Sequence, residues 1–260
     1  MNTDLFLRSV RFQNGFPSVK RKEEYLLELP AVRALEGDGL SFSQPVTFFV
    51  GENGSGKSTL LEAIAAAWGF NPEGGSINFN FSTKETHSGL HRALLLRRGA
   101  RRPRDGYFLR AESFYNVASE IDRLDEIETV GDDDSPFLQA YGGRSLHEQS
   151  HGESFFALVT NRLGGNGLYL FDEPEAALSA VRQMALLSAI HELVKKGSQF
   201  LIATHSPILT AYPHAEIYAL SEHGVQKTPY EETEPYLITK RFLNAPGRML
   251  RELLGEEDAL

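Results

Sequence analysis

A glycine-rich segment, Gly51 to Thr59 (GENGSGKST), carries the residue types that bind phosphate groups. It fits the pattern G-x-x-x-x-G-K-[ST], which needs a strand before it and a helix after it. Glycines let backbone N–H groups converge on phosphate oxygens, and the helix N-terminus adds its positive dipole end. Lys57 is expected at the β- and γ-phosphates of a nucleotide, and Ser58 at Mg²⁺. The predicted binding residues are Gly51, Glu52, Asn53, Gly54, Ser55, Gly56, Lys57, Ser58 and Thr59.

Two adjacent carboxylates, Asp172 and Glu173, follow an apolar run that is typical of a buried strand (168–171). Adjacent strand residues point in opposite directions, so Asp172 can serve the metal while Glu173 faces the γ-phosphate and an attacking water. His205 follows another apolar run and is expected at the mouth where ligands bind in open α/β sheets. The sequence therefore predicts Glu173, His205 and Lys57 as catalytic residues, and Ser58 and Asp172 as Mg²⁺ ligands.

The elements that position these residues alternate between strands and helices, which favours an α/β P-loop NTPase with a mostly parallel central sheet flanked by helices. A single domain is expected over residues 1–260, with an arginine-rich insertion at about 71–106 and a helical and acidic segment at about 112–140. Strands are predicted at 3–12, 25–29, 46–50, 107–111, 168–171, 199–204 and 215–220. Helices are predicted at 61–70, 112–128, 179–196, 234–243 and 246–254, with one more ending at Leu163.

The three motifs and a further segment, QSHGES (149–154), resemble those of ABC-type ATPases in order and spacing. The chain is identified as a small stand-alone member of the AAA/ABC-like ATPase group that includes RecF and SMC-type proteins. The resemblance implies an antiparallel β subdomain, ATP and Mg²⁺ as cofactors, and two ATP molecules held between the subunits of a homodimer. It also implies that Ser150, Gly152 and Glu153 of one subunit act on the ATP bound by Lys57 of the other.

Several positions depart from the pattern of that family. His151 replaces the first glycine of L-S-G-G-Q, and Ser179 stands where transporters usually carry aspartate. No glutamine follows the 107–111 strand in the usual place, so Glu112 and Asn116 are the candidate replacements. These departures count against a transporter subunit, whose corresponding loop couples to a membrane partner.

Composition excludes several other classes of protein. The chain has 260 residues, 41% of them hydrophobic, and no cysteine, which excludes disulfide scaffolds, cysteine nucleophiles and zinc fingers. A net charge of −9 argues against coating nucleic acid over the whole surface. No apolar run approaches the ~20 residues of a membrane span, and no signal peptide is evident, so the expected location is cytoplasmic.

A local cluster of arginines reverses this acidic balance. Three interpretations stay open: contact with DNA phosphates, docking of an acidic protein or of the chain's own 132–134 loop, or a solvated surface. The cluster comprises Arg92, Arg97, Arg98, Arg101, Arg102 and Arg104.

Alternative functions also follow from these patterns. The ATPase could act in DNA repair or phage defence, or as a switch or ABC-transporter-type subunit that drives a protein partner. A remote alternative is a zinc hydrolase, because residues 147–151 fit H-E-x-x-H, with Glu173 or Glu175 as a third ligand. Glycines close to this motif argue against the rigid continuous helix that such a site needs.

Overall fold

The computed structural model of the chain describes residues 5–14, 21–76, 88–112, 118–119, 121–123, 145, 147 and 151–255. Its centre is a seven-stranded sheet with the strand order β10-β9-β3-β8-β7-β6-β4. Five strands pair in parallel, and the edge strands β4 and β10 pair antiparallel. The parallel strands are β3 (Val46–Gly51), β6 (Asp105–Arg110), β7 (Gly167–Asp172), β8 (Gln199–Ala203) and β9 (Glu216–Ser221); the edge strands are β4 (Gly75–Ser76) and β10 (Gly224–Lys227).

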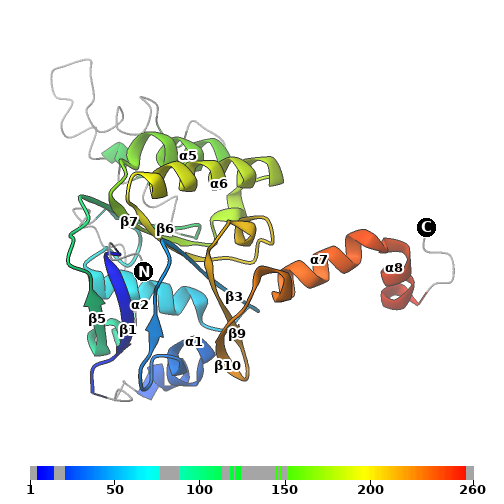
Figure 1. Cartoon of the computed structure of the whole chain (residues 1–260), viewed down its shortest axis with the longest axis horizontal. Helices are drawn as coiled ribbons and strands as arrows, with labels where there is room; N and C mark the ends of the chain where they lie inside the picture. The colour runs from blue at the N-terminus through cyan, green and yellow to red at the C-terminus, as the bar shows by residue number, and fades with distance from the viewer. Residues whose placement is uncertain are drawn as a thin grey trace.

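Helices cover both faces of this sheet, which is why its central strands are continuous apolar runs. Alternate side chains enter two cores: Phe49 packs on the side of α2 (Lys57–Trp68), and Phe48 on the side of α6 (Ala180–Lys195). Figure 1 shows α2 on one side of the sheet, with α5 (His151–Ala157) and α6 on the other. The predicted fold class, a mostly parallel sheet flanked by helices, is confirmed.

A second, antiparallel sheet joins β2 (Leu40–Ser41), β1 (Leu7–Phe12) and β5 (Leu94–Arg98) in that order. Gln199 of β8 ties it to the central sheet. The Gln199 Oε1 atom accepts hydrogen bonds from the N–H groups of Phe6 and Leu7 at 2.9 Å, and its Nε2 donates to the Leu7 carbonyl at 2.8 Å. This sheet is the antiparallel subdomain implied by the resemblance. The stretch expected as an insertion contains β4 and β5, so part of it belongs to the two sheets.

Most of the predicted elements that fall on described residues are present. Helix α6 begins after Ser179, whose side chain accepts a hydrogen bond from the Arg182 N–H, and Gly197 follows its end with a φ of +82°. The helix expected to end at Leu163 is α5, continued by a π-helical turn at Leu158–Arg162. Residues 118–119 and 121–123 are helical, and the rest of the 112–128 prediction beyond Glu112 lies outside the described residues.

The strand predicted at 25–29 is wrong. A 3₁₀ helix occupies Arg21–Glu28, and the short helix α1 (Pro30–Arg33) follows it. The Leu29 N–H bonds locally to the Leu26 carbonyl, and Pro30 supplies the fixed φ that starts a helix. Tyr25 is 64% exposed, so the segment lacks the buried face that an apolar strand would have. Local hydrogen bonds therefore outweighed the strand propensity of these residues.

The C-terminal helices α7 (Glu234–Asn244) and α8 (Pro246–Leu254) extend away from the rest of the chain (Figure 1). Both were predicted, and neither has a buried residue. Within the described ranges, no helix is both long and apolar enough to cross a membrane.

Candidate active site

The phosphate loop connects the end of β3 to the first turn of α2, as the motif requires. Gly54 and Gly56 have φ angles of +83° and +89°, in the left-handed region that favours glycine. A Cβ atom on Gly56 would lie 3.0 Å from the Leu29 Cβ, so this position is also short of space. Glycine lets the backbone turn here so that its N–H groups can face one anion.

Lys57 is buried at the start of α2 and spans the loop. Its Nζ atom donates to the carbonyl oxygens of Gly51 at 2.8 Å and Glu52 at 2.9 Å. Burial lowers the pKa of Lys57, whereas three carboxylates at the end of β7 and in the turn that follows it act in the opposite direction. The ammonium group therefore lies where the phosphates of a nucleotide bound by this loop would contact it.

Asp172 is the last residue of β7, and its Oδ1 is buried without a hydrogen-bond partner in the described part of the chain. Burial raises the pKa of Asp172 to about 6, although the Ser58 hydroxyl and the Arg110 guanidinium act to lower it. Ser58 is the second residue of α2 and thus comes from the phosphate loop. An unsatisfied buried carboxylate oxygen beside a hydroxyl fits the oxygen ligands that Mg²⁺ prefers.

Glu173 and His205 face each other across the ends of β7 and β8. The Glu173 Oε1 atom is 3.7 Å from the His205 Nε2 atom, and their side chains are 40% and 35% exposed. Glu173 has a φ of +50°, which is uncommon for a residue other than glycine, and its N–H donates to the Ala203 carbonyl at 2.9 Å. Both side chains line an open cleft of about 590 Å³ that also includes Glu52 and Asn53.

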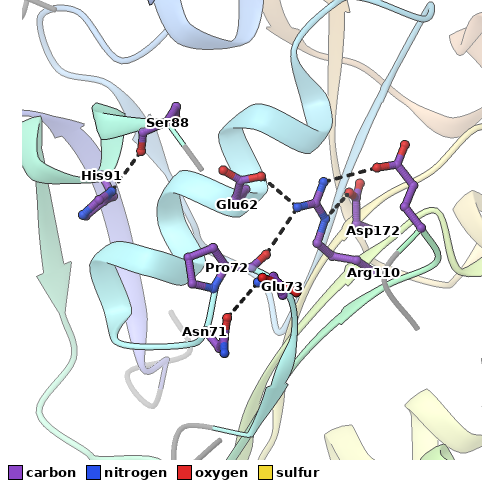
Figure 2. Close-up of polar contacts among 9 residues, drawn as sticks. Glu62, Asn71, Pro72, Glu73, Ser88, His91, Arg110 and Asp172 are labelled. Atoms are coloured by element: carbon purple, nitrogen blue, oxygen red, sulfur yellow. Dashed lines mark hydrogen bonds and ion pairs between the residues drawn. The ribbon is translucent and has the colours of Figure 1, made fainter. Parts of the chain in front are cut away.

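Arg110 is a site residue that the sequence analysis missed. It ends β6, in register with Asp172, and Figure 2 shows its side chain between Glu62 of α2 and Asp172. Its Nη1 atom is 2.8 Å from Glu62 Oε2, and its Nε atom is 3.7 Å from Asp172 Oδ2. Glu112, the candidate replacement for the missing glutamine, also lies within 3.5 Å of Arg110. The register between β6 and β7 brings Arg110 beside Asp172, and that register cannot be derived from a motif.

The segment expected to act on the partner's ATP begins α5. Glu153 Oε1 is 3.5 Å from Arg182 Nη2 of α6. A Cβ atom on Gly152 would meet Arg182 Nη1 at 2.3 Å and the Ala177 carbonyl at 2.8 Å, so the glycine permits close packing. Ser150 and Asn116 lie outside the described residues. The structure thus places Gly152 and Glu153 against α6, and their role on a second subunit stays a prediction.

The arginine cluster is spread over several environments. The Arg98 guanidinium lies 4.3 Å from the centre of the Trp68 ring, and Arg101 donates to Asn166 Oδ1 at 2.7 Å. These two arginines therefore make contacts within the chain. All six members of the cluster are nevertheless exposed: Arg92, Arg97, Arg98, Arg101, Arg102 and Arg104. The acidic loop at 132–134 lies outside the described residues.

The H-E-x-x-H pattern is only partly described. His147 Nε2 is 3.0 Å from the Ser119 hydroxyl, while residues 148–150 and the side chain of His151 are outside the described part. Among the side chains that the structure describes, no group of three or more histidines and carboxylates is arranged to hold a metal ion.

The fold and this arrangement of loop, lysine and strand-end carboxylates define a P-loop ATPase domain of the AAA/ABC-like class. The family model described as "AAA domain, putative AbiEii toxin, Type IV TA system" matches residues 78–211, just over half of the chain, and the chain belongs to this family. A second model, described as "AAA domain", matches residues 27–127. The identification made from the motifs is confirmed.

The comparison with curated proteins finds a putative ABC transporter ATP-binding protein of Pyrococcus furiosus, 29% identical over 248 residues, which cover 85% of this chain and 92% of the relative. Similar solved structures include an ATP-binding cassette of an ABC transporter, with 18% identity, coverage of 92% and 98% of the two chains and a TM-score of 0.49. They also include the SMC head domain from Thermotoga maritima, with 17% identity, coverage of 73% and 92% and a TM-score of 0.39.

Proposed function

We propose that the chain, as one domain over residues 1–260, binds Mg·ATP at the loop 51–59 and hydrolyses it to ADP and phosphate. The observation that carries this proposal is the meeting of Lys57, Asp172, Glu173 and His205 at the carboxyl ends of β3, β7 and β8. Lys57 and the loop N–H groups would contact the phosphates, and Ser58 and Asp172 would hold Mg²⁺. When bound, Mg²⁺ neutralises charge on the phosphate oxygens.

In this proposal Glu173 acts on the attacking water. Its carboxylate orients the water and takes a proton as the water oxygen bonds to the γ-phosphorus. The bond from the γ-phosphorus to the bridging oxygen breaks, and ADP leaves with the bonding electrons. His205 donates a hydrogen bond to a γ-phosphate oxygen, where negative charge is concentrated.

We also propose that ATP closes two copies of the chain over two nucleotides, and that hydrolysis reopens them. The open cleft supports this, because Glu173 and His205 are 40% and 35% exposed, and phosphoryl transfer profits from excluding bulk water. Ser150, Gly152 and Glu153 of the second copy would complete each site.

The test is steady-state ATP hydrolysis with Mg²⁺, together with ATP binding and oligomeric state. Lys57→Ala should abolish ATP binding, because it removes the cationic side chain that the proposal places on the phosphates, and unchanged affinity would refute the site. Glu173→Gln should retain ATP and accumulate as a dimer in light scattering coupled to gel filtration. A strictly monomeric Glu173→Gln variant at saturating ATP would refute the closure of two copies.

The proposed location is cytoplasmic, and two effectors are candidates. DNA is supported by the exposed arginines, and it would fit a role in DNA repair or phage defence. A protein partner is supported by the relative named as an ABC transporter ATP-binding protein. Hydrolysis measured with double-stranded DNA across a salt series separates them. Stimulation that fades steeply with salt indicates phosphate contacts, and indifference to DNA favours the protein partner.

A further inference from the structure

Glu175 connects the two loops that carry Glu173 and His205. It lies in the 3₁₀ helix Pro174–Ala177, immediately after β7. Its Oε2 atom accepts a hydrogen bond from the Thr204 hydroxyl at 2.7 Å, and its Oε1 accepts one from the His205 N–H at 2.6 Å. Both bonds are short, as expected for donors that meet a charged acceptor. A single carboxylate thus fixes two consecutive residues at the end of β8.

These bonds complete a two-point attachment between the loops. The first point is the hydrogen bond from the Glu173 N–H to the Ala203 carbonyl, and the second is the pair of bonds accepted by Glu175. Thr204 is fully buried, and its hydroxyl oxygen also accepts from the Ser206 N–H at 3.0 Å. With both sides held, the backbone of His205 has little freedom to turn its ring away from Glu173.

A carboxylate is the side chain that this position requires. Thr204 and His205 each present a hydrogen, so the side chain between them must accept twice through two separate oxygens. Glutamine could accept from only one of the two donors through its oxygen, and its amide nitrogen would present hydrogens to the Thr204 hydroxyl. Alanine would leave both donors without this partner beside the cleft.

We propose that Glu175 is a positioning residue for ATP hydrolysis, which holds the His205 imidazole facing Glu173. This inference rests on the proposed function, because the geometry it maintains matters for catalysis only if Glu173 and His205 act on the γ-phosphate. Glu175 itself does not touch the reacting atoms in this role. Its loss should therefore lower kcat and leave nucleotide binding intact, since binding depends on the phosphate loop.

The experiment compares Glu175→Ala, Glu175→Gln and Thr204→Val in the full chain, by ATP hydrolysis and by titration with a fluorescent ATP analogue. Glu175→Ala should lower kcat by roughly 10- to 100-fold, the size expected when catalytic groups shift by about 1 Å. The dissociation constant should change by less than about threefold, and Glu175→Gln should recover part of the rate. Glu175→Ala/Thr204→Val should be slowed by less than the product of the two single effects, because the bond between these two side chains is lost in both single variants.

Tyr169→Phe provides a matched control. The Tyr169 hydroxyl donates to Asp105 at 2.8 Å, at the opposite ends of the strands from the site. Its loss should lower stability without changing kcat. A Glu175→Ala variant with unchanged kcat, or one whose binding weakens as much as its rate, would overturn the positioning role.

A second readout needs no hydrolysis. The His205 amide should exchange with solvent at least about tenfold faster in Glu175→Ala than in the wild type, because its acceptor is gone. Unchanged exchange would refute the inference even if the wild type hydrolyses ATP. A different outcome is that exchange is faster in Glu175→Ala, while the wild type binds ATP through Lys57 but does not hydrolyse it. This outcome would refute the proposed function and, with it, the catalytic role of Glu175.

Discussion

Replacing Arg110 with methionine tests how the charges around Asp172, the proposed metal ligand, are balanced. The Arg110 side chain is 17% exposed, and it lies between the Glu62 and Asp172 side chains, which are 16% and 5% exposed (Figure 2). Methionine keeps much of the volume and removes the charge. Arg110→Met therefore leaves two largely buried carboxylates without their shared counter-ion.

The expected loss of stability in Arg110→Met can be estimated from the distances in this cluster. At an effective dielectric constant of about 20, unit charges 3.7 Å apart, the separation of Arg110 Nε and Asp172 Oδ2, attract by about 4.5 kcal/mol. The desolvation of the guanidinium offsets part of this attraction. Since breaking a buried ion pair typically costs about 3–5 kcal/mol, and this cluster is slightly exposed, we expect Arg110→Met to lower the free energy of unfolding by roughly 2–4 kcal/mol.

The assay is equilibrium unfolding in urea with EDTA present. The matched control is Arg248→Met, because Arg248 pairs with Glu252 one helical turn away and is 72% exposed, so its loss should cost at most about 0.5 kcal/mol. Arg110→Met/Glu62→Leu should be more stable than Arg110→Met, since it removes one of the stranded charges. If Arg110→Met costs no more than the control, or the double variant is simply additive, this reasoning is refuted.

The effect should also depend on pH. Because burial already raises the pKa of Asp172 to about 6 and Arg110 lowers it, Arg110→Met should raise it further. The folded state then binds more protons than the unfolded state, so stability falls as pH rises through this range. The destabilisation by Arg110→Met should therefore be larger at pH 8 than at pH 5. An equal or smaller loss at pH 8 would contradict the role given to Asp172.

Two further variants test the residues that support the strands and the phosphate loop. Burial acts to raise the pKa of Asp105, but the Gly164 N–H, Arg162 and Tyr169 outweigh it and hold the pKa below its ordinary value. Asp105→Asn should thus cost roughly 1–3 kcal/mol at pH 7. This loss should shrink as pH falls from about 4, where the unfolded wild-type carboxyl takes up a proton, through the lower pKa that the carboxyl has in the folded state; unfolding curves at pH 7 and in acid check this. Gly56→Ala should strain the loop by about 1–2 kcal/mol and weaken ATP affinity in calorimetry, since Gly56 has a φ of +89°.

The motifs predicted which residues lie at the strand ends of the site, because each motif places polar side chains directly next to the strand or helix that positions them. Asp172 and His205 follow buried apolar runs, and parallel strands bring their carboxyl ends to one edge. The sequence could therefore place Lys57, Asp172, Glu173 and His205 together before the strand order was known. The fold class followed from the same alternation of apolar runs and helices.

The missed features depend on contacts between distant segments. Arg110 meets Asp172 through the β6–β7 register, and Gln199 bonds the backbone at Leu7, which is 192 positions away. Glu175 was considered only as a zinc ligand, because nothing local shows that its carboxylate reaches Thr204. Strand β5 was missed because Leu95 is apolar but exposed, so its run of three leucines and two arginines lacks the alternation of an antiparallel strand. Such pairings are set by tertiary packing, which no short motif encodes.

The charges around Lys57 connect these observations. Three carboxylates interact electrostatically with its ammonium group: Asp172, Glu173 and Glu175. Both carboxylate oxygens of Glu175 also accept hydrogen bonds, one from Thr204 and one from His205. An ATP molecule without metal would add further negative charge beside these carboxylates, and the two carbonyl bonds of Lys57 would have to be exchanged for phosphate contacts. A nucleotide that arrives with Mg²⁺ carries less net charge and offers a partner for the unsatisfied Asp172 Oδ1 atom. The same carboxylates that would disfavour the bare nucleotide would thus select the metal-bound form. In the proposed function, metal dependence would then be a property of this charge arrangement and not of Asp172 alone.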